Sequence, residues 1–213
     1  MGGDVGVLDA LVARVLATYP YRFTVVDDAD DRDLAYRIRY AAALDQGWIA
    51  AQDYPDGLEN DEYDATAVHV LGWDGTEAVA TGRLVFPPHP LPTEQVAGLV
   101  VEPRGRVADV GRMSVLPTYR SYRQAAFVAL LCRLYLEMRA HGYDVACGLM
   151  SLRVRNLLRQ LGLELEVLGP DRTYWSEPRA PVRFALAVNA LSLGRRWSPQ
   201  PDASEGEGAR RPG

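Results

Sequence analysis

Acidic and arginine side chains gather in four separated blocks of this sequence, and several of them adjoin apolar runs. The charged members of these blocks are Arg39, Asp61, Asp64, Arg83, Asp109 and Arg112. A charge beside a buried strand is costly unless it is paired or used in chemistry. Because Asp61 and Asp64 are three residues apart, one helical turn or a tight loop would aim both carboxylates the same way. Such carboxylates can dock a cationic group and take up its proton, while nearby guanidinium groups keep them ionised.

Hydrophobic spacing predicts the elements that must position these blocks. The predicted helices span residues 5–18, about 30–44 and 123–139, and a short helix opens at the N-cap Ser151. The predicted strands span residues 21–26, 67–72, 78–86, 107–116, 143–149, 163–168 and 182–188. A turn at Asp74-Gly75 makes a hairpin of the second and third strands, and residues 87–92 form a proline-rich loop. A strand-rich first half followed by alternating strands and helices predicts an α/β (α+β) fold, with a mixed twisted sheet flanked by helices.

Length and composition favour one globular domain. The chain has 213 residues, of which 48% are hydrophobic, and this is enough for a full core. We expect the domain to cover residues 1–197 and to be followed by a disordered tail over residues 198–213, where Pro, Ser, Glu, Gly and Arg dominate. No apolar run approaches the roughly 20 residues of a membrane span, and no secretory signal pattern is present, so we expect a cytoplasmic protein.

Charge and residue types argue against several classes of function. A net charge of −5 without a basic block argues against a nucleic-acid partner. All 23 basic residues are Arg, which excludes a lysine Schiff base and a Walker-type phosphate loop. Cys132 and Cys147 lie in apolar runs, as buried free thiols do, and the His residues share no ligand spacing with them. We therefore expect no metal site.

In this order the blocks resemble those of the autoinducer (acyl-homoserine-lactone) synthases and the related N-acyl amino acid synthases, within the acetyltransferase-like (GNAT) superfamily. The family's second block, acidic-x-Asp-x-aromatic-Asp, is matched in full by residues 59–64. The third block, a strand that ends in Arg-Leu, is matched at Arg83. The fourth block, Glu-x-x-Arg, is matched by Asp109 and Arg112 with a shorter acid. The resemblance covers most of the chain.

Two segments depart from the patterns of these families. In the first block, Arg39 and Gly47-Trp48 match, but their spacing is one residue short, the aromatic position holds Ala or Leu, and Arg37 is a rival for the Arg position. The turn at residues 120–125 lacks the glycine of common acetyltransferases and has Arg123 in its place. Arg120 and Arg123 would then bind phosphate through their side chains, and a solvated surface turn is the alternative.

The resemblance implies a GNAT-like three-layer sandwich and assigns roles to individual residues. The implied catalytic residues are Asp64, Asp109, Arg112 and Ser114. Asp64 would orient an amine, Asp109 would accept its proton, and Ser114 would protonate the leaving thiolate. The implied substrate-binding residues are Arg39, Trp48, Asp61, Tyr63 and Arg83. The implied acyl-thioester contacts are Met113, Val115, Arg120 and Arg123. The alternatives are a structural Asp109–Arg112 ion pair, an ordinary strand serine at Ser114 and a core or loop role for Trp48.

The resemblance therefore predicts an N-acyltransferase. Its co-substrate would be an acyl thioester on acyl carrier protein or coenzyme A, with no tightly bound cofactor, and its acceptor a small amine such as an amino acid or a biosynthetic intermediate. Acyl carrier protein would be a partner if it is the donor. The alternatives are an acyl-homoserine-lactone synthase that uses S-adenosylmethionine, a coenzyme A-dependent acetyltransferase, and a non-catalytic domain that binds acyl groups or metabolites.

Overall fold

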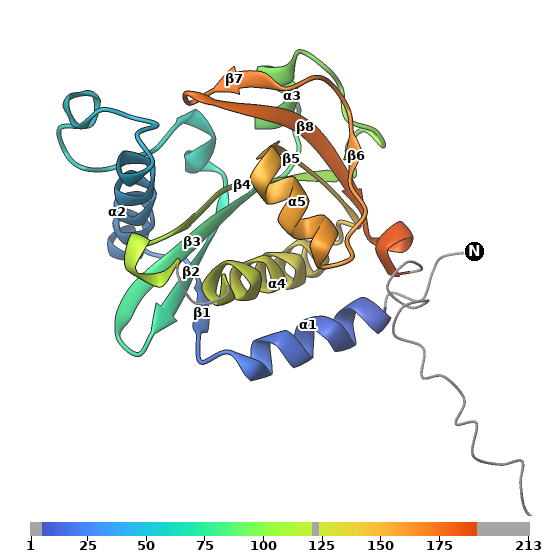
Figure 1. Cartoon of the computed structure of the whole chain (residues 1–213), viewed down its shortest axis with the longest axis horizontal. Helices are drawn as coiled ribbons and strands as arrows, with labels where there is room; N and C mark the ends of the chain where they lie inside the picture. Colours follow the sequence, from blue (N-terminus) through green and yellow to red (C-terminus); the bar gives the residue numbers. More distant parts are fainter. Residues whose placement is uncertain (1–5, 121–123, 191–213) are drawn as a thin grey trace, which may run out of the picture.

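The computed structural model describes residues 6–120 and 124–190, which fold around one mixed eight-stranded sheet (Figure 1). The strand order is β1-β2-β3-β4-β5-β8-β6, and β7 pairs with β8. The strands are β1 (Arg22–Val25), β2 (Val68–Asp74), β3 (Glu77–Val85), β4 (Val107–Val115), β5 (Val145–Ser151), β6 (Glu166–Val167), β7 (Arg172–Tyr174) and β8 (Glu177–Ala185). Among the pairs in this sheet, β4 and β5 run parallel and the others run antiparallel. The predicted mixed sheet is confirmed.

Helices cover both faces of the sheet and complete three layers (Figure 1). They are α1 (Gly6–Thr18), α2 (Ala29–Asp45), α3 (Pro92–Ala97), α4 (Ala125–Ala140) and α5 (Leu152–Gln160). Side chains alternate along a strand, so the neighbours Val70 and Leu71 point to opposite faces. Val70 joins the main core with Leu130 and Leu134 of α4, whereas Leu71 packs with Ile38 of α2. Helix α1 runs alongside α4 and packs against it, and its Leu8 joins the main core.

The central strands β4 and β5 separate partway along their length. Their pairing runs from Val107 opposite Val145 to Asp109 opposite Cys147 and stops there. A side chain on Gly148 would come within 2.7 Å of the Val110 carbonyl oxygen, so only glycine allows the strands to stay this close at the point where they part. Beyond this point β4 keeps its pairing with β3 alone and β5 keeps its pairing with β8. The remaining edge of β4 is therefore open.

Several elements differ from those predicted. The loop predicted at residues 87–92 leads directly into α3, a helix of only six residues in which the Glu94 carboxylate accepts from the Leu91 N–H. The last long strand runs over Glu177–Ala185, earlier than predicted, because it pairs along all of β5. It also pairs with β7, which the sequence did not predict, whereas the strand predicted at 163–168 shrinks to the two residues of β6.

Some predictions concern features that the described residues only partly cover. The domain boundary at residue 197 and the tail at 198–213 lie outside the described residues. Within the described part of the chain, no helix is both long and apolar enough to cross a membrane. In the same residues, no group of three or more His, Cys, Asp or Glu side chains is placed to hold a metal ion.

Candidate active site

Arg39 is the centre of a buried ionic network on the α2 face of the sheet. It lies on α2, is only 2% exposed, and its Nε donates to the Glu59 carboxylate. Its Nη1 and Nη2 donate to the two carboxylate oxygens of Asp64 at 2.8 and 3.0 Å. This is the bidentate arrangement that the planar guanidinium favours. Because Asp64 is also buried, water does not screen the pair.

Arg83 and Arg112 extend this network toward the middle of the sheet. Arg83 Nη1 donates to Asp61 at 2.5 Å and to Asp64 at 2.7 Å. Arg112 Nη2 donates to Asp61 at 2.7 Å, and its Nε lies 3.1 Å from a Glu59 oxygen. The network therefore joins three guanidinium groups to three carboxylates. Its formal charges cancel.

The same pairing keeps Asp64 ionised. Burial by itself would raise the pKa of Asp64, but Arg39 and Arg83 outweigh it and hold the pKa at about 2. Burial also opposes the charged form of Arg83, yet its bonds to Asp61 and the charge of Asp64 raise its pKa above the ordinary value. Both oxygens of Asp64 are bonded already, so the predicted role of Asp64 in orienting an amine would act through its neighbour Asp61.

A local capping arrangement explains how residues 59–64 present their acids. Asp61 caps the short helical turn Glu62–Ala65 and accepts from the Tyr63 N–H at 3.0 Å. Asp64 reaches back and accepts from the Asp61 N–H at 2.7 Å. Such a reciprocal capping box satisfies two backbone donors and fixes both side chains. The Asp-x-x-Asp spacing therefore builds the acidic part of the network.

A β-bulge directs Arg112 into the network. Thr81 pairs with Ser114 and Arg83 pairs with Gly111, so β4 has one residue more than β3 between these pairs. Arg112 lies in this bulge with a φ of +52°, which is unusual for a residue with a side chain. A bulge breaks the alternation of side chains and turns one of them to a new direction. Arg112 thereby reaches the same side of the sheet as Arg83.

Asp109 lies apart from Arg112, which corrects the idea that the two form a structural ion pair. Its Oδ2 accepts from the Thr93 N–H at 2.7 Å, and the Cys147 Sγ lies 3.5 Å away. Arg112 pairs with Glu59 and Asp61 instead. Burial raises the pKa of Asp109, against the lowering effect of its hydrogen bond from Thr93. Asp109 is thus a carboxylate whose proton affinity exceeds that of an exposed acid.

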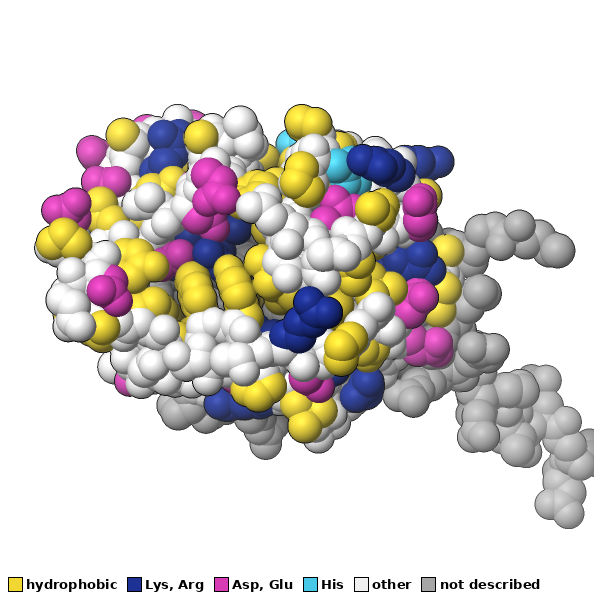
Figure 2. Space-filling model, turned by 90° about the horizontal axis from the view of Figure 1, so that it is seen from above, with side chains coloured by type: hydrophobic (Ala, Val, Ile, Leu, Met, Phe, Trp, Pro, Cys, Tyr) yellow, Lys and Arg dark blue, Asp and Glu magenta, His cyan; other side chains and the backbone are white. Residues whose placement is uncertain are grey.

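A polar cavity of about 160 Å³ opens beside this network. Its walls come from the 59–64 segment, α3, β4 and the β7–β8 hairpin, and the lining residues include Asp61, Tyr63, Arg83, Thr93, Asp109, Arg112, Tyr174 and Arg179. Most of the predicted substrate-binding and catalytic residues therefore meet at one place. Figure 2 shows the upper face of the molecule hollowed beside α2, with hydrophobic side chains next to Arg and acidic ones.

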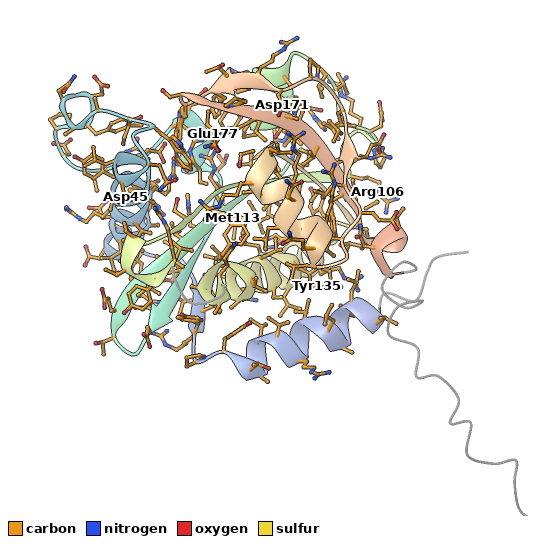
Figure 3. The ribbon with its side chains drawn as sticks, viewed as in Figure 1. Asp45, Arg106, Met113, Tyr135, Asp171 and Glu177 are labelled. Atoms are coloured by element: carbon orange, nitrogen blue, oxygen red, sulfur yellow. The ribbon has the colours of Figure 1, made fainter. Side chains whose placement is uncertain are left out.

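A second cavity, the platform cavity, lies at the open edge of β4. Its volume is about 160 Å³, and its lining includes Met113, Ser114, Val115 and Trp48 together with the first turns of α4 and α5. Met113, labelled in Figure 3, projects from β4 beside the start of α4. The predicted thioester-binding strand therefore faces a cavity.

Of the two predicted phosphate-binding arginines, Arg120 is described and Arg123 lies outside the described residues. The Arg120 guanidinium donates to the carbonyl oxygens of Val115 at 2.9 Å and Ala42 at 3.2 Å, and it pairs with Asp45. These bonds tie the end of α2 to β4 and occupy three nitrogens of the side chain. Arg153 of α5 also lines the platform cavity, where no sequence signal singled it out.

A third cavity, the apolar cavity, lies on the opposite face of the sheet. It measures about 220 Å³ and is enclosed mainly by aliphatic side chains of α1, α4, β5, α5 and β8. Val110 and Met150, which flank the point where β4 and β5 part, both line it. Leu131 and Leu134 of α4 line it as well, whereas Phe127 lines the platform cavity. Helix α4, which the sequence predicts to be part of the core, therefore lines both the apolar cavity and the platform cavity.

Three contributors to the site were not predicted from the sequence. Arg179 and Tyr174 line the polar cavity, and the Tyr174 hydroxyl lies 3.4 Å from Arg112. The Arg112 guanidinium lies over the ring of Trp175, with its Cζ 4.1 Å from the ring centre. All three come from the β7–β8 hairpin, which is far from the charged blocks in sequence. The Tyr-Trp-Ser-Glu stretch carries no ordinary turn signal, so the hairpin could be found only from its pairing.

Comparisons with known proteins agree with this fold. Residues 38–130 match the family model of the acetyltransferase (GNAT) domain. The coenzyme A-dependent acyl-homoserine lactone synthase MesI is 25% identical, with a TM-score of 0.61 over 87% of this chain and 100% of that chain. BjaI, a synthase of the same kind with S-adenosylmethionine and isopentyl-coenzyme A, is 17% identical, with a TM-score of 0.68 over 83% of this chain and 89% of that chain. No curated protein matches the sequence.

An N-acyl amino acid synthase shares the same architecture. FeeM, from uncultured soil microbes, is 16% identical and has a TM-score of 0.62 over 84% of this chain and 98% of that chain. The matched domain includes β2, β3, β4 and the start of α4, and it holds all six residues of the ionic network. Residues 38–130 accordingly match a GNAT acetyltransferase domain, and the fold of the chain is that of the acyl-homoserine-lactone and N-acyl amino acid synthases; together these findings indicate an acyltransferase.

Proposed function

We propose that this protein transfers an acyl group from a thioester to the amine of a small acceptor. The observation that carries the proposal is that residues 109–115 of β4, beside the point where β4 and β5 part, line all three cavities. The platform cavity would take the thioester arm, the apolar cavity the acyl chain and the polar cavity the amine. Val110 would lie between the acyl chain and the carboxylates of the polar cavity, because its side chain points to the opposite face of the sheet from Asp109.

The open edge of β4 supplies a donor for the oxyanion. The Leu116 N–H donates to the Val79 carbonyl of β3 at 2.9 Å. Because N–H directions alternate along an extended strand, the Val115 N–H points to the opposite, open edge. A backbone donor beside a thioester carbonyl stabilises the tetrahedral intermediate, and losing one such donor costs about 3–4 kcal/mol. This part of β4 therefore acts through its backbone.

Proton transfer is assigned to Asp109. The amine must lose a proton to attack the thioester carbon, and a base with a raised pKa accepts that proton near neutral pH more readily than an exposed carboxylate. Attack of the amine forms the new C–N bond and gives the tetrahedral intermediate. Its collapse breaks the C–S bond, and the departing thiolate takes up a proton for which Ser114, in the platform cavity, is the candidate donor. Arg112, together with Arg83, donates hydrogen bonds to Asp61 and fixes its carboxylate beside the incoming amine.

Two finer assignments belong to the same proposal. The acyl group arrives on coenzyme A or on acyl carrier protein, and the latter would then be a partner. The reaction takes place in the cytoplasm, where both carriers are found.

Mass spectrometry of the products tests the proposal. The purified protein is mixed with acyl-carrier-protein and acyl-coenzyme A thioesters and a pool of amino acids, polyamines and S-adenosylmethionine. An acylated amine is the expected product, whereas an acyl-homoserine lactone with methylthioadenosine would mean that S-adenosylmethionine is the acceptor. Intact thioesters in every mixture would refute acyl transfer to these amines.

A pair of variants tests the site itself. Arg112→Ala removes the bulged arginine and should lower kcat at least about tenfold, since misplacing charged groups by a small distance is costly. Arg106→Ala is the matched control, because Arg106 is exposed at the far end of β4 and is labelled there in Figure 3. Equal rates for the two variants would remove Arg112 from the mechanism.

A further inference from the structure

A fourth cavity, the side cavity, adjoins the polar cavity and has no part in the mechanism above. Its volume is about 300 Å³, and its walls come from α3, β5, the loop after β6 and the β7–β8 hairpin. Most of the walls are aliphatic or proline side chains, among them Leu99, Leu149, Leu168, Pro170 and Pro181. A largely apolar space of this kind favours a hydrocarbon ligand over a polar one.

The side cavity lies on the same face of the sheet as the polar cavity. Cys147 pairs with Asp109 across the sheet, and its Sγ lies beside that carboxylate. Leu149 is two positions further along β5, so its side chain shares this face. The apolar cavity, on the opposite face, has no lining residue in common with the side cavity. The side cavity is therefore separate from the site proposed for the acyl chain.

Four lining residues belong to both the side cavity and the polar cavity, so the two spaces share a boundary. They are Val96, Leu149, Tyr174 and Arg179. Two residues of a strand rise about 7 Å, so Leu149 lies only a few bonds from an amine bound at Asp109. A small ligand can therefore reach both cavities at once.

Contacts outside the side cavity fix its walls. The ring of Tyr174 stacks on that of Trp175, with 5.8 Å between ring centres. The loop before β7 is tied to α5 by an ion pair of 2.6 Å between Asp171, labelled in Figure 3, and the buried Arg155. The Leu168 N–H donates to the Pro181 carbonyl oxygen at 2.9 Å. The cavity is therefore formed without a ligand.

The charges around the side cavity oppose a second cation. Its described lining includes Arg172 and Arg179 but no acid. The partner of Arg179 is Glu177, at 3.0 Å, and this glutamate lines the platform cavity instead. An ammonium group that entered the side cavity would lose water without gaining a carboxylate, which is costly. A hydrocarbon group would gain from the same loss of water.

We propose that the acceptor amine carries an apolar substituent that the side cavity binds while its nitrogen faces Asp109. The inference rests on the acyl transfer proposed above and names the acceptor class for the same site, a monoamine with a hydrocarbon tail. A cavity of about 150 Å³ holds benzene, so the side cavity, at about 300 Å³, has room for a larger hydrocarbon group. Short amines would leave this space to water, and diamines would place a cation in it.

Three matched amines test the proposal with octanoyl-coenzyme A and octanoyl acyl carrier protein as donors. Hexylamine adds a tail to ethylamine, and pentane-1,5-diamine has the same length as hexylamine but ends in an ammonium group. We expect kcat/KM for hexylamine to exceed that for ethylamine at least about tenfold, because four further methylene groups leave water. We expect a similar excess over the diamine. Equal values in either comparison would overturn the inference and leave the acyl transfer standing.

A second series removes any dependence on a carboxylate in the acceptor. Alanine, norleucine and ornithine carry a short side chain, a hydrocarbon tail and a cationic tail of the same length beside one common carboxylate. If only this series is acylated, we expect the same order within it, with norleucine the best acceptor. Equal values within the acylated series would overturn the inference.

Variants then locate the preference in the side cavity. Leu168→Trp should narrow the cavity from the loop after β6, and Ala97→Leu should narrow it from α3. Either change should bring the preference for the longer tail close to one, through a higher KM for the long amine. Val167→Trp is the matched control, because Val167 precedes Leu168, is 43% exposed and is not among the lining residues, and it should keep the preference.

The remaining outcomes separate the inference from the proposed function. An undiminished preference in both Leu168→Trp and Ala97→Leu would overturn the assignment to the side cavity. If the donors acylate an amine of the larger mixture described above but none of these acceptors, the inference fails and acyl transfer stands. If no mixture yields an acylated product, the proposed acyl transfer fails and the inference fails with it.

Discussion

Asp64→Asn should destabilise the protein strongly, because it breaks the centre of the buried network. Asp64 is 4% exposed and receives both Nη atoms of Arg39 as well as one from Arg83. The difference between the ordinary carboxyl pKa of 3.8 and about 2 corresponds to about 2 kcal/mol of stability at neutral pH. The variant also leaves two guanidinium groups buried without their anion, which raises the expected cost to about 3–5 kcal/mol.

Thermal unfolding measures this effect. For a chain of this size, a loss of about 3–5 kcal/mol lowers Tm by roughly 6–20 °C. The matched control is Asp45→Asn, which breaks an ion pair with Arg120 whose acid is 42% exposed, and which should cost no more than about 1 kcal/mol. A Tm for Asp64→Asn no lower than that of the control would refute the reasoning.

The pH dependence of stability isolates the same carboxylate. Because the folded pKa lies below the unfolded value, the contribution of Asp64 is fully present above about pH 5 and is lost as the pH falls through about 2. Asparagine does not titrate, so the gap in unfolding free energy between wild type and variant should narrow by about 1 kcal/mol between pH 7 and pH 3. Urea denaturation at the two pH values measures it. A constant gap would show that the pKa of Asp64 is not lowered.

Three further predictions concern the site and its hairpin. A cavity of about 150 Å³ holds the six carbons of benzene, so the apolar cavity, at about 220 Å³, should hold about nine. Across thioesters with straight acyl chains, kcat/KM should therefore rise up to about nine acyl carbons and then fall; a flat profile would contradict the apolar cavity as the acyl site. In a pH–rate profile, kcat/KM should rise through the raised pKa of Asp109 as that group loses its proton, and Asp109→Asn should remove this limb and lower kcat at least about hundredfold; an unchanged limb would assign it to another group. Ser176→Gly should raise Tm by about 2–4 °C in a calorimetric scan, because glycine adopts a φ of +57° without strain, and a lower Tm would show that the serine side chain stabilises the turn.

Local signals account for the parts of the fold that the sequence predicted well. Helix α4 follows apolar spacing and ends at Ala140, two residues before Gly142, which has a φ of +82°. The β2–β3 hairpin turns at Gly75, and its strands have the expected composition. The Asp-x-x-Asp spacing of Asp61 and Asp64 is itself a capping box. In each case the residues that make the contact are close in sequence, so their types and spacing were sufficient to predict the element.

The remaining features depend on contacts between distant residues. The turn of Arg112 toward Asp61 results from a bulge that exists only in the pairing of β4 with β3. The place of Arg179 depends on the register of β8 against β5, which no short motif encodes. Helix α3 has only six residues, too few to show a helical period. The sequence therefore predicted most of the charged residues of the site but not how they pair.

The alternation of side chains along β4 has a consequence for how substrate preference can change. Val110 faces the apolar cavity, while its neighbours Asp109 and Gly111 face the polar one. A substitution in α4 or α5 that reshapes the apolar side need not disturb the hairpin and loop residues on the other side. Selection could therefore alter the preferred acyl-chain length and the preferred acceptor independently, because the two cavities lie on opposite sides of one strand. Descendants of such a scaffold could diversify their products in a combinatorial way.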